Sequence, residues 1–367
     1  MISRIPYSIQ CIAFLCLLFI VSYTSVLVVL KWAVRRTVFD IPNGRSSHDS
    51  ATPLGGGIAI VFITLIGGSL AFVCTGDTSC HWMPGYLLGG VLIALVSWMD
   101  DVKSQSTAVR LVTHSLGALL AVLTIGYVHR IALPTGGVWT LGWAALPFTL
   151  LWIIGLTNVY NFMDGIDGLA GGQSVVACLG WLIFGMLSHE RSIVFISLLV
   201  GFSSLGFLCH NWSPARIFMG DVGSTFLGYS FAVFTVVAAQ IDSRMVVVGA
   251  LFVWPFIFDA AVTLVQRCIQ REKLFLAHRT HLYQKMVRSG LDHGHVAMIY
   301  IQASLIGVAL ALTWYLKMVR FPLMVAILPP LCLGLWKSAS MSKQGRPVIQ
   351  GSDDVTSAPD PSVQLPV

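Results

Sequence analysis

The sequence predicts an all-α integral membrane protein, a bundle of about eleven transmembrane helices. Hydrophobic residues make up 56% of its 367 residues and charged residues only 10%, whereas soluble domains carry about 25% charged residues. The mean hydropathy is +0.80, and the apolar residues fall in runs of roughly 20, the length that crosses a bilayer as a helix. A soluble multi-domain protein is excluded. The net charge of +6 is therefore interpreted through the sidedness of loops, and not as a sign of nucleic-acid binding.

The apolar runs divide the chain in order. We place the spans at 8–30, 55–74, 84–99, 110–129, 142–158, 173–188, 193–209, 223–240, 245–265, 296–316 and 321–337. The first run is too long for a signal-peptide core and is predicted to be retained. The third run is short, and Pro329 and Pro330 allow the last run to be a re-entrant pair, so ten spans is the alternative count. Residues 1–337 form the predicted membrane domain, and the Ser-, Pro- and Asp-rich residues 338–367 a disordered tail.

Basic residues assign the two sides of the membrane. With the N-terminus outside, the segments predicted to lie inside hold 16 of the 22 Lys and Arg residues, as the positive-inside rule requires. Every segment with unusual polar residues also falls inside. An interfacial enzyme is expected to place its chemistry at one face, whereas a transporter places polar groups near mid-membrane. Outside, Cys74 and Cys80 flank one short loop and are able to pair in an oxidising compartment.

The chain is organised around the stretch 158–172, which lies between two apolar runs. Asp164 and Asp167 are three residues apart, so one helical turn would place them on a shared face with Asn161. A charge near hydrocarbon is costly, about 2.5–3.5 kcal/mol per Asp at a helix centre, and is usually kept for a ligand, an ion or a proton. The alternative is a Gly-rich loop with solvated carboxylates.

Two further segments add carboxylates at the inside face. Asp100 and Asp101 end an apolar run, and adjacent carboxylates need a cation, a metal or a shared proton; a simple helix-end cap is the alternative. Asp221 stands between two glycines just before a span. Backbone N–H groups at a helix start favour phosphate, and a neighbouring Asp suits Mg²⁺ that bridges phosphates. Phe218 is placed either to stack on a base or to lie at the membrane interface.

The remaining polar segments are a glycine run and a basic loop. Residues 52–57 are placed at the start of the second span, where glycines also serve close helix packing. The last inside loop carries His278, Arg279 and His281, which are able to donate to diphosphate oxygens or to meet anionic lipid head groups. Asp259 follows Pro255 inside the ninth span and is expected to face the bundle interior or a wet cavity, with no role assigned.

With these segments described, the chain resembles the polyprenyl-phosphate N-acetylhexosamine-1-phosphate transferases. The resemblance covers about residues 45–295 and rests on five ordered motifs. They are T-P-x-x-G-G at 52–57 with one extra Gly, the D-D pair at 100–101, N-x-x-D-G-x-D-G at 161–168, N-x-x-P-A-x-x-F-x-G-D-x-G-S at 211–224, and a His-containing loop at 278–281. The branch that starts surface polysaccharides has the more similar late loop. The pentapeptide-translocase branch has consecutive His residues there and a different spacing of the Lys after the D-D pair.

The resemblance implies an activity and a set of site residues. The implied reaction transfers an N-acetylhexosamine 1-phosphate from a UDP-sugar to undecaprenyl phosphate at the bacterial cytoplasmic (inner) membrane, with Mg²⁺ on Asp221 and Mn²⁺ as the alternative ion. Asp100 and Asp101 are implied to handle the prenyl phosphate. The other implied substrate contacts are Asn161, Asp164, Asp167, Asn211, Phe218, His278, Arg279, His281, Thr52 and Arg45. The partners implied are the two substrates and membrane lipid, without nucleic acid, and a homodimer is left open.

Two alternatives of other classes remain at this point. A transporter or flippase would need charged residues deep in several spans, and Asp259 alone qualifies. A non-catalytic scaffold predicts that the Asp and His residues are replaceable. Within the enzyme interpretation, a covalent intermediate on Asp221 is less economical than direct transfer, since both substrates are able to meet in one site.

Overall fold

The computed structural model describes residues 7–42, 50–75, 80–272, 280–318 and 321–340. Arg45, His278, Arg279 and residues 341–367 of the predicted tail lie outside the described residues. The helices are α1 Tyr7–Arg35, α2 Gly57–Thr75, α3 Met83–Val102, α4 Thr107–Ile125, α5 Ala145–Phe162, α6 Leu169–Leu187, α7 Arg191–Asn211, α8 Asp221–Ile241, α9 Met245–Phe252, α10 Trp254–Ile269, α11 Leu282–Arg288, α12 His293–Tyr315 and α13 Phe321–Ser340. A short 3₁₀ helix, η3 Gly142–Ala144, precedes α5.

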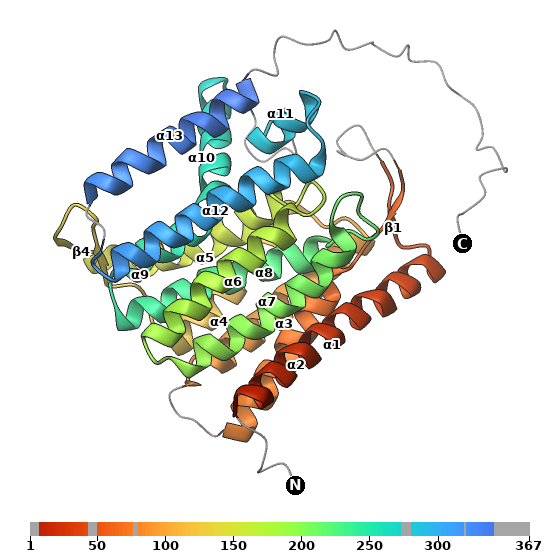
Figure 1. Ribbon diagram of the computed structural model, residues 1–367, viewed down its shortest axis with the longest axis horizontal. Helices are drawn as coiled ribbons and strands as arrows, with labels where there is room; N and C mark the ends of the chain where they lie inside the picture. Colours follow the sequence, from red (N-terminus) through yellow and green to blue (C-terminus); the bar gives the residue numbers. More distant parts are fainter. Residues whose placement is uncertain (1–6, 43–49, 76–79, 273–279, 319–320, 341–367) are drawn as a thin grey trace.

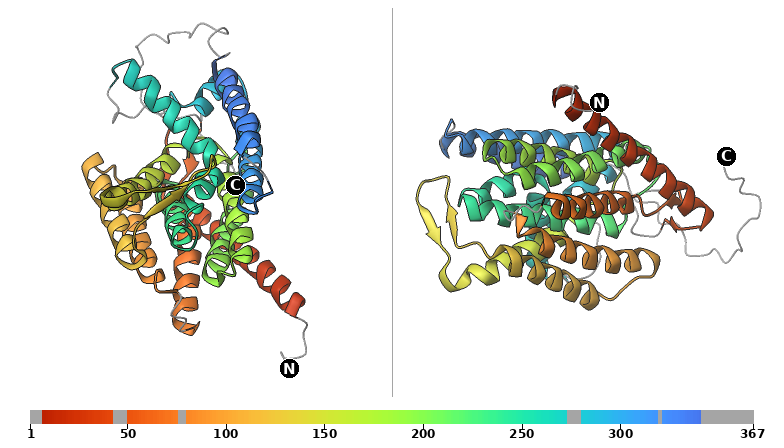
Figure 2. Two further views of the ribbon diagram at one scale, coloured as in Figure 1. Left: turned by 90° about the vertical axis from the view of Figure 1, so that its left-hand side faces the viewer. Right: turned by 90° about the horizontal axis from the view of Figure 1, so that it is seen from below.

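Strand structure is confined to two short antiparallel ribbons in the part of the chain that the structure describes. One pairs β1 Phe39–Asp40 with β2 Thr52–Pro53. The other pairs β3 Arg130–Ala132 with β4 Val138–Thr140. Figures 1 and 2 show the ribbons at opposite ends of a bundle of long helices. The fold is therefore a helix bundle with a small ribbon at each end.

Among the described helices, nine are long and apolar enough to cross a membrane, or ten if α9 and α10 form one broken span. This confirms the predicted class, a polytopic helical membrane protein. The predicted run at 245–265 is not one straight helix, because α9 and α10 meet at 82°. The last run is a single helix that contains Pro329 and Pro330, and not a re-entrant pair. Cys74 is exposed and Cys80 is buried, and the structure does not join the two in the predicted outside disulfide.

The break between α9 and α10 has identifiable causes. Pro255 lies in the first turn of α10, where its missing N–H is tolerated. A proline inside a helix would break it, so α9 cannot continue through Pro255 as one helix. The carbonyl of Phe252 instead accepts a hydrogen bond from Gln173 Nε2 at 2.8 Å. Trp254 Nε1 donates to the carbonyl of Ala303 at 2.9 Å. Polar groups at the bend are thus bonded inside the bundle, as a membrane interior requires.

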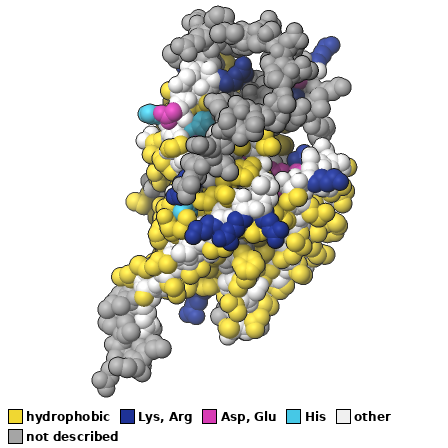
Figure 3. All heavy atoms as spheres, turned by 90° about the vertical axis from the view of Figure 1, so that its right-hand side faces the viewer, with side chains coloured by type: hydrophobic (Ala, Val, Ile, Leu, Met, Phe, Trp, Pro, Cys, Tyr) yellow, Lys and Arg dark blue, Asp and Glu magenta, His cyan; other side chains and the backbone are white. Residues whose placement is uncertain are grey.

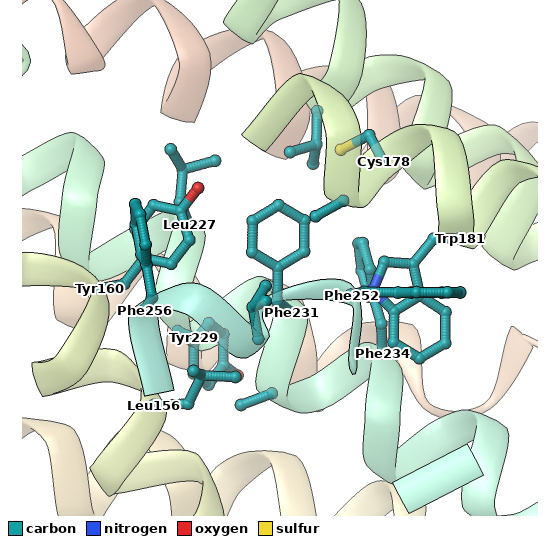
Figure 4. Close-up of a cluster of buried hydrophobic side chains, with 14 of the residues drawn as sticks. Leu156, Tyr160, Cys178, Trp181, Leu227, Tyr229, Phe231, Phe234, Phe252 and Phe256 are labelled. Carbon is teal, nitrogen blue, oxygen red and sulfur yellow. The ribbon is translucent and has the colours of Figure 1, made fainter. Parts of the chain in front are cut away.

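Helix α8 forms the centre of the bundle, with almost all its residues buried. Aromatic side chains gather around it (Figure 4). Trp181 of α6 meets Phe234 and Phe252 edge-on, with ring centroids 5.9 and 5.1 Å apart. Tyr160 of α5 packs on Phe231 at 5.5 Å. Aromatic pairs in this geometry add about 0.5–1.5 kcal/mol each beyond their buried area, so α5, α6 and α9 are fixed against α8.

The up-and-down order of the helices brings the predicted polar segments to one end. Helices α3, α5 and α7 end there, and α4, α6, α8 and α12 begin there, beside β1 and β2 (Figure 1). Figure 3 looks on to this end, where Lys and Arg side chains gather among apolar surface, with some Asp or Glu side chains in a hollow and others at the outer surface. The β3–β4 ribbon lies at the far end. The alternation places this end on the side that the Lys and Arg count predicts to be inside.

Candidate active site

The N-terminus of α8 is held by a carboxylate from the end of α3. Asp101 Oδ1 accepts the backbone N–H of Asp221 at 2.7 Å, and Oδ2 accepts that of Val222 at 3.1 Å. Gly220 precedes the helix at φ +81°, and a Cβ there would lie 2.7 Å from Asp101 Oδ2. Glycine is thus required both by its conformation and by the close carboxylate. Asp101 satisfies two helix-start N–H groups that would otherwise lack partners.

Side chains from four helices meet at Asp221. Asn161 of α5 donates through Nδ2 to Asp221 Oδ1 at 2.8 Å and to Ser224 Oγ at 3.0 Å. Arg110 of α4 places Nη1 3.3 Å from Asp100 Oδ2 and 3.7 Å from Asp221 Oδ2. The Asp221 side chain is 33% exposed, whereas that of Asp100 is 6% exposed. Asp221 is thus the more accessible of these two carboxylates.

Arg110 lies between the two carboxylates and offsets their mutual repulsion. Two negative charges held this close favour a cation between them, and a guanidinium can contact both at once. Asp100 also accepts the backbone N–H of Gln105, which fixes the turn leading into α4. Arg110 is therefore able to exchange its carboxylate partners for an anionic ligand. The carboxylates are then able to bind the cation that accompanies the ligand.

Asp164 adds a fourth carboxyl group on the turn between α5 and α6. Burial, together with the charge of Asp221, raises the pKa of Asp164 to about 8. The first cause disfavours any buried charge, and the second is repulsion between like charges. Asp164 is therefore largely protonated at neutral pH until a cation or another positive group reduces the repulsion.

The prediction that Asp164 and Asp167 share one helical face is wrong. Helix α5 ends at Phe162 and α6 begins at Leu169, and Gly168 lies at φ +75°, so the segment between them is a turn. Asp164 interacts with Asp221, whereas Asp167 Oδ1 lies 3.2 Å from His293 Nδ1. Because residues 163–168 belong to neither helix, the two carboxyl groups contact different partners.

Asp167 and Asn211 bind this turn to the segment before α8. Asp167 Oδ2 accepts the backbone N–H of Ala215 at 3.1 Å. Burial acts to raise the pKa of Asp167, but the hydrogen bonds from His293 and Ala215 outweigh it and lower that pKa. Asn211 accepts the N–H of Gly168 and donates to the carbonyl of Ile217, both at 2.9 Å. Both side chains thus position the two loops, and their predicted contact with a sugar nucleotide stays a prediction.

The glycine run at 52–57 joins β2 to α2 beside the same site. A Cβ on Gly57 would overlap the Cα of Gly223, so α2 and α8 cross with their backbones in contact. The carbonyl of Phe218 accepts the N–H of Gly56 at 2.8 Å. Thr52 is 6% exposed and donates to the carbonyl of Ser50 at 3.2 Å. These glycines allow close helix packing, which was one of the two interpretations of the glycine run. Thr52 is held inside the ribbon.

His281 lies at the start of α11 and is tied to the interior of the bundle. Its side chain is 5% exposed, and its Nδ1 lies 3.0 Å from Asp259 Oδ1. Asp259, expected to face the bundle interior, is fully buried. The contact of His281 with a diphosphate stays a prediction, and those of Arg45, His278 and Arg279 concern residues outside the described ranges.

Sequence reasoning did not assign three polar residues that line this site. Besides Arg110, these are His114 one turn further along α4 and Asn158 of α5, whose Nδ2 lies 3.1 Å from His114 Nδ1. His114 is 3% exposed. The four-residue spacing of Arg110 and His114 could have identified these two as candidates, because it places both on one helix face. Their partners on α3 and α5, however, are set by packing alone.

The chemistry of the donor set suits a hard cation. No group of three or more His, Cys, Asp and Glu side chains able to hold a metal is found within the described residues, which disfavours an all-protein cage there. Mg²⁺ prefers one or two carboxylates together with waters and substrate oxygens. Asp221, partly exposed, and Asp100 beside it present such oxygens, so the residues fit Mg²⁺ bound jointly with a phosphate ligand.

Comparison with known proteins adds an independent observation. Residues 83–239 match the model of glycosyl transferase family 4. The chain is 32% identical to the probable undecaprenyl-phosphate N-acetylglucosaminyl 1-phosphate transferase of Bacillus subtilis, over 77% of this chain and 80% of the relative. It is 27% identical to the decaprenyl-phosphate N-acetylglucosaminephosphotransferase of Mycobacterium leprae, over 80% and 81%. It is 32% identical to the phospho-N-acetylmuramoyl-pentapeptide-transferase of Lactiplantibacillus plantarum, over 56% and 66%.

Fold and site together define a multi-pass membrane protein with an acidic, phosphate-compatible centre at one end of its bundle. The matched segment runs from α3 through α8 and so includes the carboxylates of both helices. The chain belongs to glycosyl transferase family 4, whose members similar to it are glycosyl-1-phosphate transferases acting on polyprenyl phosphates.

Proposed function

We propose that this protein transfers an N-acetylhexosamine 1-phosphate from a UDP-sugar to undecaprenyl phosphate and releases UMP. The product is a lipid-linked sugar diphosphate that starts a surface polysaccharide of the O-antigen kind. The reaction takes place at the cytoplasmic face of the bacterial inner membrane. The proposal rests on the family and on the resemblance of the five motifs to those of the surface-polysaccharide branch.

One observation supports the proposal above the others. Asp100, Arg110, Asn161 and Asp221 come from four helices and meet within hydrogen-bonding or ion-pairing distance. A charged centre at a helix start, at the end of a membrane bundle, suits a reaction between a water-soluble anion and a lipid phosphate. The polyprenyl tail stays in lipid, while its phosphate reaches the end of the bundle where the polar segments meet.

The transfer requires one phosphorus–oxygen bond to form and another to break. An oxygen of the prenyl phosphate attacks the sugar-proximal phosphorus of the donor, and the bond to the UMP oxygen breaks. A phosphate monoester has its second pKa near ~6, so the attacking oxygen is largely deprotonated at neutral pH. The side chains therefore contribute mainly by placement and by charge, the two terms that dominate such transfers.

The individual residues take distinct parts in this scheme. Arg110 is placed to leave the carboxylates and contact a phosphate that approaches Asp100. Asn161 holds Asp221 in position through the 2.8 Å hydrogen bond. Asp101 acts through the backbone, because both its oxygens bind the start of α8. Asp100 is thus the better candidate of the D-D pair for orienting the acceptor phosphate.

Asp221 and Asp100 are the residues that would hold Mg²⁺, with Mn²⁺ as the alternative ion. The bound cation would supply positive charge against the charge on the donor diphosphate. Because the groups around Asp221 come from four helices, a small shift of any of them changes the alignment of donor and acceptor. Correct alignment of reacting groups accounts for a large share of rate acceleration in general.

The transporter alternative receives no support from the buried charge that suggested it. Asp259 accepts hydrogen bonds from several side-chain and backbone donors around it. A side chain held in this way serves to fix helices and does not line a route for a solute. The predicted polar segments lie instead at one end of the bundle.

The test is an assay in nanodiscs with undecaprenyl phosphate and a panel of UDP-N-acetylhexosamines. UMP and lipid product are measured with and without Mg²⁺. Equal amounts of UMP and of lipid-linked sugar diphosphate, formed only with a divalent cation, are expected. In a parallel assay with sealed vesicles, movement of a labelled sugar into the lumen without UMP release would contradict the proposal. A trapped phospho-aspartyl enzyme would contradict direct transfer.

A further inference from the structure

A fully buried carboxylate in α10 collects five hydrogen-bond donors. Asp259 Oδ1 accepts from the backbone N–H of Leu282 at 2.9 Å and from Thr263 Oγ1 at 3.2 Å, and it lies 3.0 Å from His281 Nδ1. Asp259 Oδ2 accepts from Tyr283 N–H at 3.1 Å and from Tyr300 Oη at 2.6 Å. Such a set of donors identifies Asp259 as an ionised, accepting carboxylate.

These contacts join three segments that are separate in the chain. Asp259 belongs to α10, Tyr300 to α12, and the two backbone N–H groups to the first turn of α11. Buried charge is tolerated only when it is fully hydrogen-bonded, so the carboxylate is tied to one arrangement of these segments. Helix α11, only seven residues long, has its start fixed by Asp259.

The contact with His281 has a chemical consequence. An ionised carboxylate has no proton to give, so Nδ1 of His281 must be the donor in the bond to Asp259. The bond therefore sets the tautomer of the imidazole and the orientation of its ring. Any contact of this ring with a bound anion then runs through Nε2, which must also carry a proton in order to donate to that anion.

His281 and α11 lie against the turn that carries the acidic site. The His281 ring is 6.3 Å from that of Phe162, and Tyr283 Oη donates to the carbonyl of Phe162 at 3.1 Å. A Cβ on Gly165 would overlap Tyr283 Oη. Phe162 is the residue after Asn161, which binds Asp221. These contacts fix the turn that contains Asp164 relative to α11.

We propose that Asp259 is a positioning residue for donor binding, which fixes the tautomer of His281 and the placement of α11 against the turn at 163–168. This role rests on the proposed function, because it assigns His281 to the diphosphate of the sugar nucleotide. Asp259 itself stays inside the bundle and touches no substrate. It affects binding of the sugar-nucleotide donor, whereas Asp100 and Arg110 are the residues assigned to the lipid phosphate.

The experiment compares Asp259→Asn with Asp259→Glu and Tyr300→Phe. The Asn variant removes the charge and keeps the shape, the Glu variant keeps the charge, and the Phe variant removes one donor from Oδ2. Substitutions in such supporting contacts at metal sites typically cost 10–100-fold. We expect Asp259→Asn to lower kcat/KM for the UDP-sugar by about that factor, with KM for undecaprenyl phosphate unchanged. Asp259→Glu should recover part of the loss, and Tyr300→Phe should cost less than Asp259→Asn.

Asp242→Asn is the matched control. Asp242 lies at the far end of the bundle, where Arg244 binds it, and its substitution should leave both KM values unchanged. Because residues acting through one another are not additive, Asp259→Asn should add less loss in a His281→Gln background than in the wild-type background. Losses that multiply, or an equal rise in the two KM values, would overturn the proposal.

A second readout does not depend on transferase activity. ¹⁵N NMR of the imidazole side chains, with His281 assigned from the His281→Gln spectrum, reports which ring nitrogen carries the proton. We expect a protonated Nδ1 in the wild-type protein and a mixture of tautomers in Asp259→Asn. An unchanged tautomer would refute the positioning role even if the transferase is confirmed. The protein could also show the expected change of tautomer and yet have no transferase activity. That result would establish the positioning of His281 and reject the proposed function.

Discussion

Asp101 accepts the backbone N–H of Asp221 at 2.7 Å, so the two acidic residues are connected through the helix start and not through their side chains. One of them shapes the site and the other presents its carboxylate to it. The two aspartates therefore differ in what their substitution should do. Loss of Asp101 should reduce stability as well as activity, whereas loss of Asp221 should reduce activity alone. This difference leads to two contrasting predictions.

Replacing Asp101 with Ala should destabilise the protein as well as reduce turnover. The substitution leaves the N–H groups of Asp221 and Val222 at the start of α8 without their acceptor. Loss of a helix cap costs about 0.5–2 kcal/mol. Thermal unfolding of the purified protein in nanodiscs measures the loss. An unchanged unfolding temperature would show that water replaces the carboxylate and that the capping role is unimportant.

Replacing Asp221 with Asn should abolish turnover and leave stability nearly unchanged. The amide keeps the size of the side chain and removes the charge at the partly exposed position. Removal of one preorganised electrostatic group typically costs about 10²–10³-fold in rate. UMP release is measured at saturating substrates over a range of Mg²⁺ concentrations. Near-normal Mg²⁺-dependent activity would contradict the assignment of the metal to Asp221.

Replacing Gly57 with Ala should destabilise the crossing of α2 and α8. A Cβ at this position overlaps the Cα of Gly223, which belongs to backbone and cannot rotate away. Overpacking of this kind costs about 1–3 kcal/mol. The control is Gly155→Ala in α5, where a Cβ meets nothing within 4 Å and helix propensity favours Ala by about 1 kcal/mol. The unfolding temperature should fall for Gly57→Ala and should not fall for Gly155→Ala; equal effects would disprove the contact.

Replacing Gln173 with Leu should weaken the bend between α9 and α10. The change removes the donor to the carbonyl of Phe252 and leaves that buried carbonyl unbonded, which costs about 1–3 kcal/mol. Gln240→Leu is the control, because Gln240 is exposed and bonds the carbonyl of Tyr127 at the surface. Unfolding by denaturing detergent compares the two variants. A larger loss for Gln240→Leu would show that the bend does not depend on Gln173.

The raised pKa of Asp164 predicts a pH dependence of stability. The folded protein binds a proton at Asp164 up to about pH 8, whereas an unfolded Asp releases its proton near pH ~4. Between these values the folded state holds more protons, so the free energy of unfolding contributed by Asp164 falls as pH rises from about 4 to 8. Thermal unfolding without divalent cations at pH 6 and pH 9 tests this for wild type and for Asp164→Asn. The variant should gain stability relative to wild type at pH 9, and a gain confined to pH 6 would contradict the sign.

The amino-acid sequence was sufficient to predict the class of fold and the end of the bundle at which its acidic segments gather. Apolar runs of bilayer length must become helices because backbone polar groups have no partners in lipid. Their alternation determines which loops share a side. Asp100, Asp221 and the stretch around Asn161 are therefore assigned to one face by the order of the apolar runs alone.

Packing in three dimensions set what each of these polar residues does. Asp101 became a helix cap, Asp167 and Asn211 became ties between loops, and Asp259 became the anchor of α11. Sequence spacing could not separate these roles, because the same carboxylate or amide bonds a ligand or a backbone N–H equally well. Which partner it meets depends on how the helices rotate and bend in the bundle, and that is set by long-range packing such as the contact of Gly57 with Gly223.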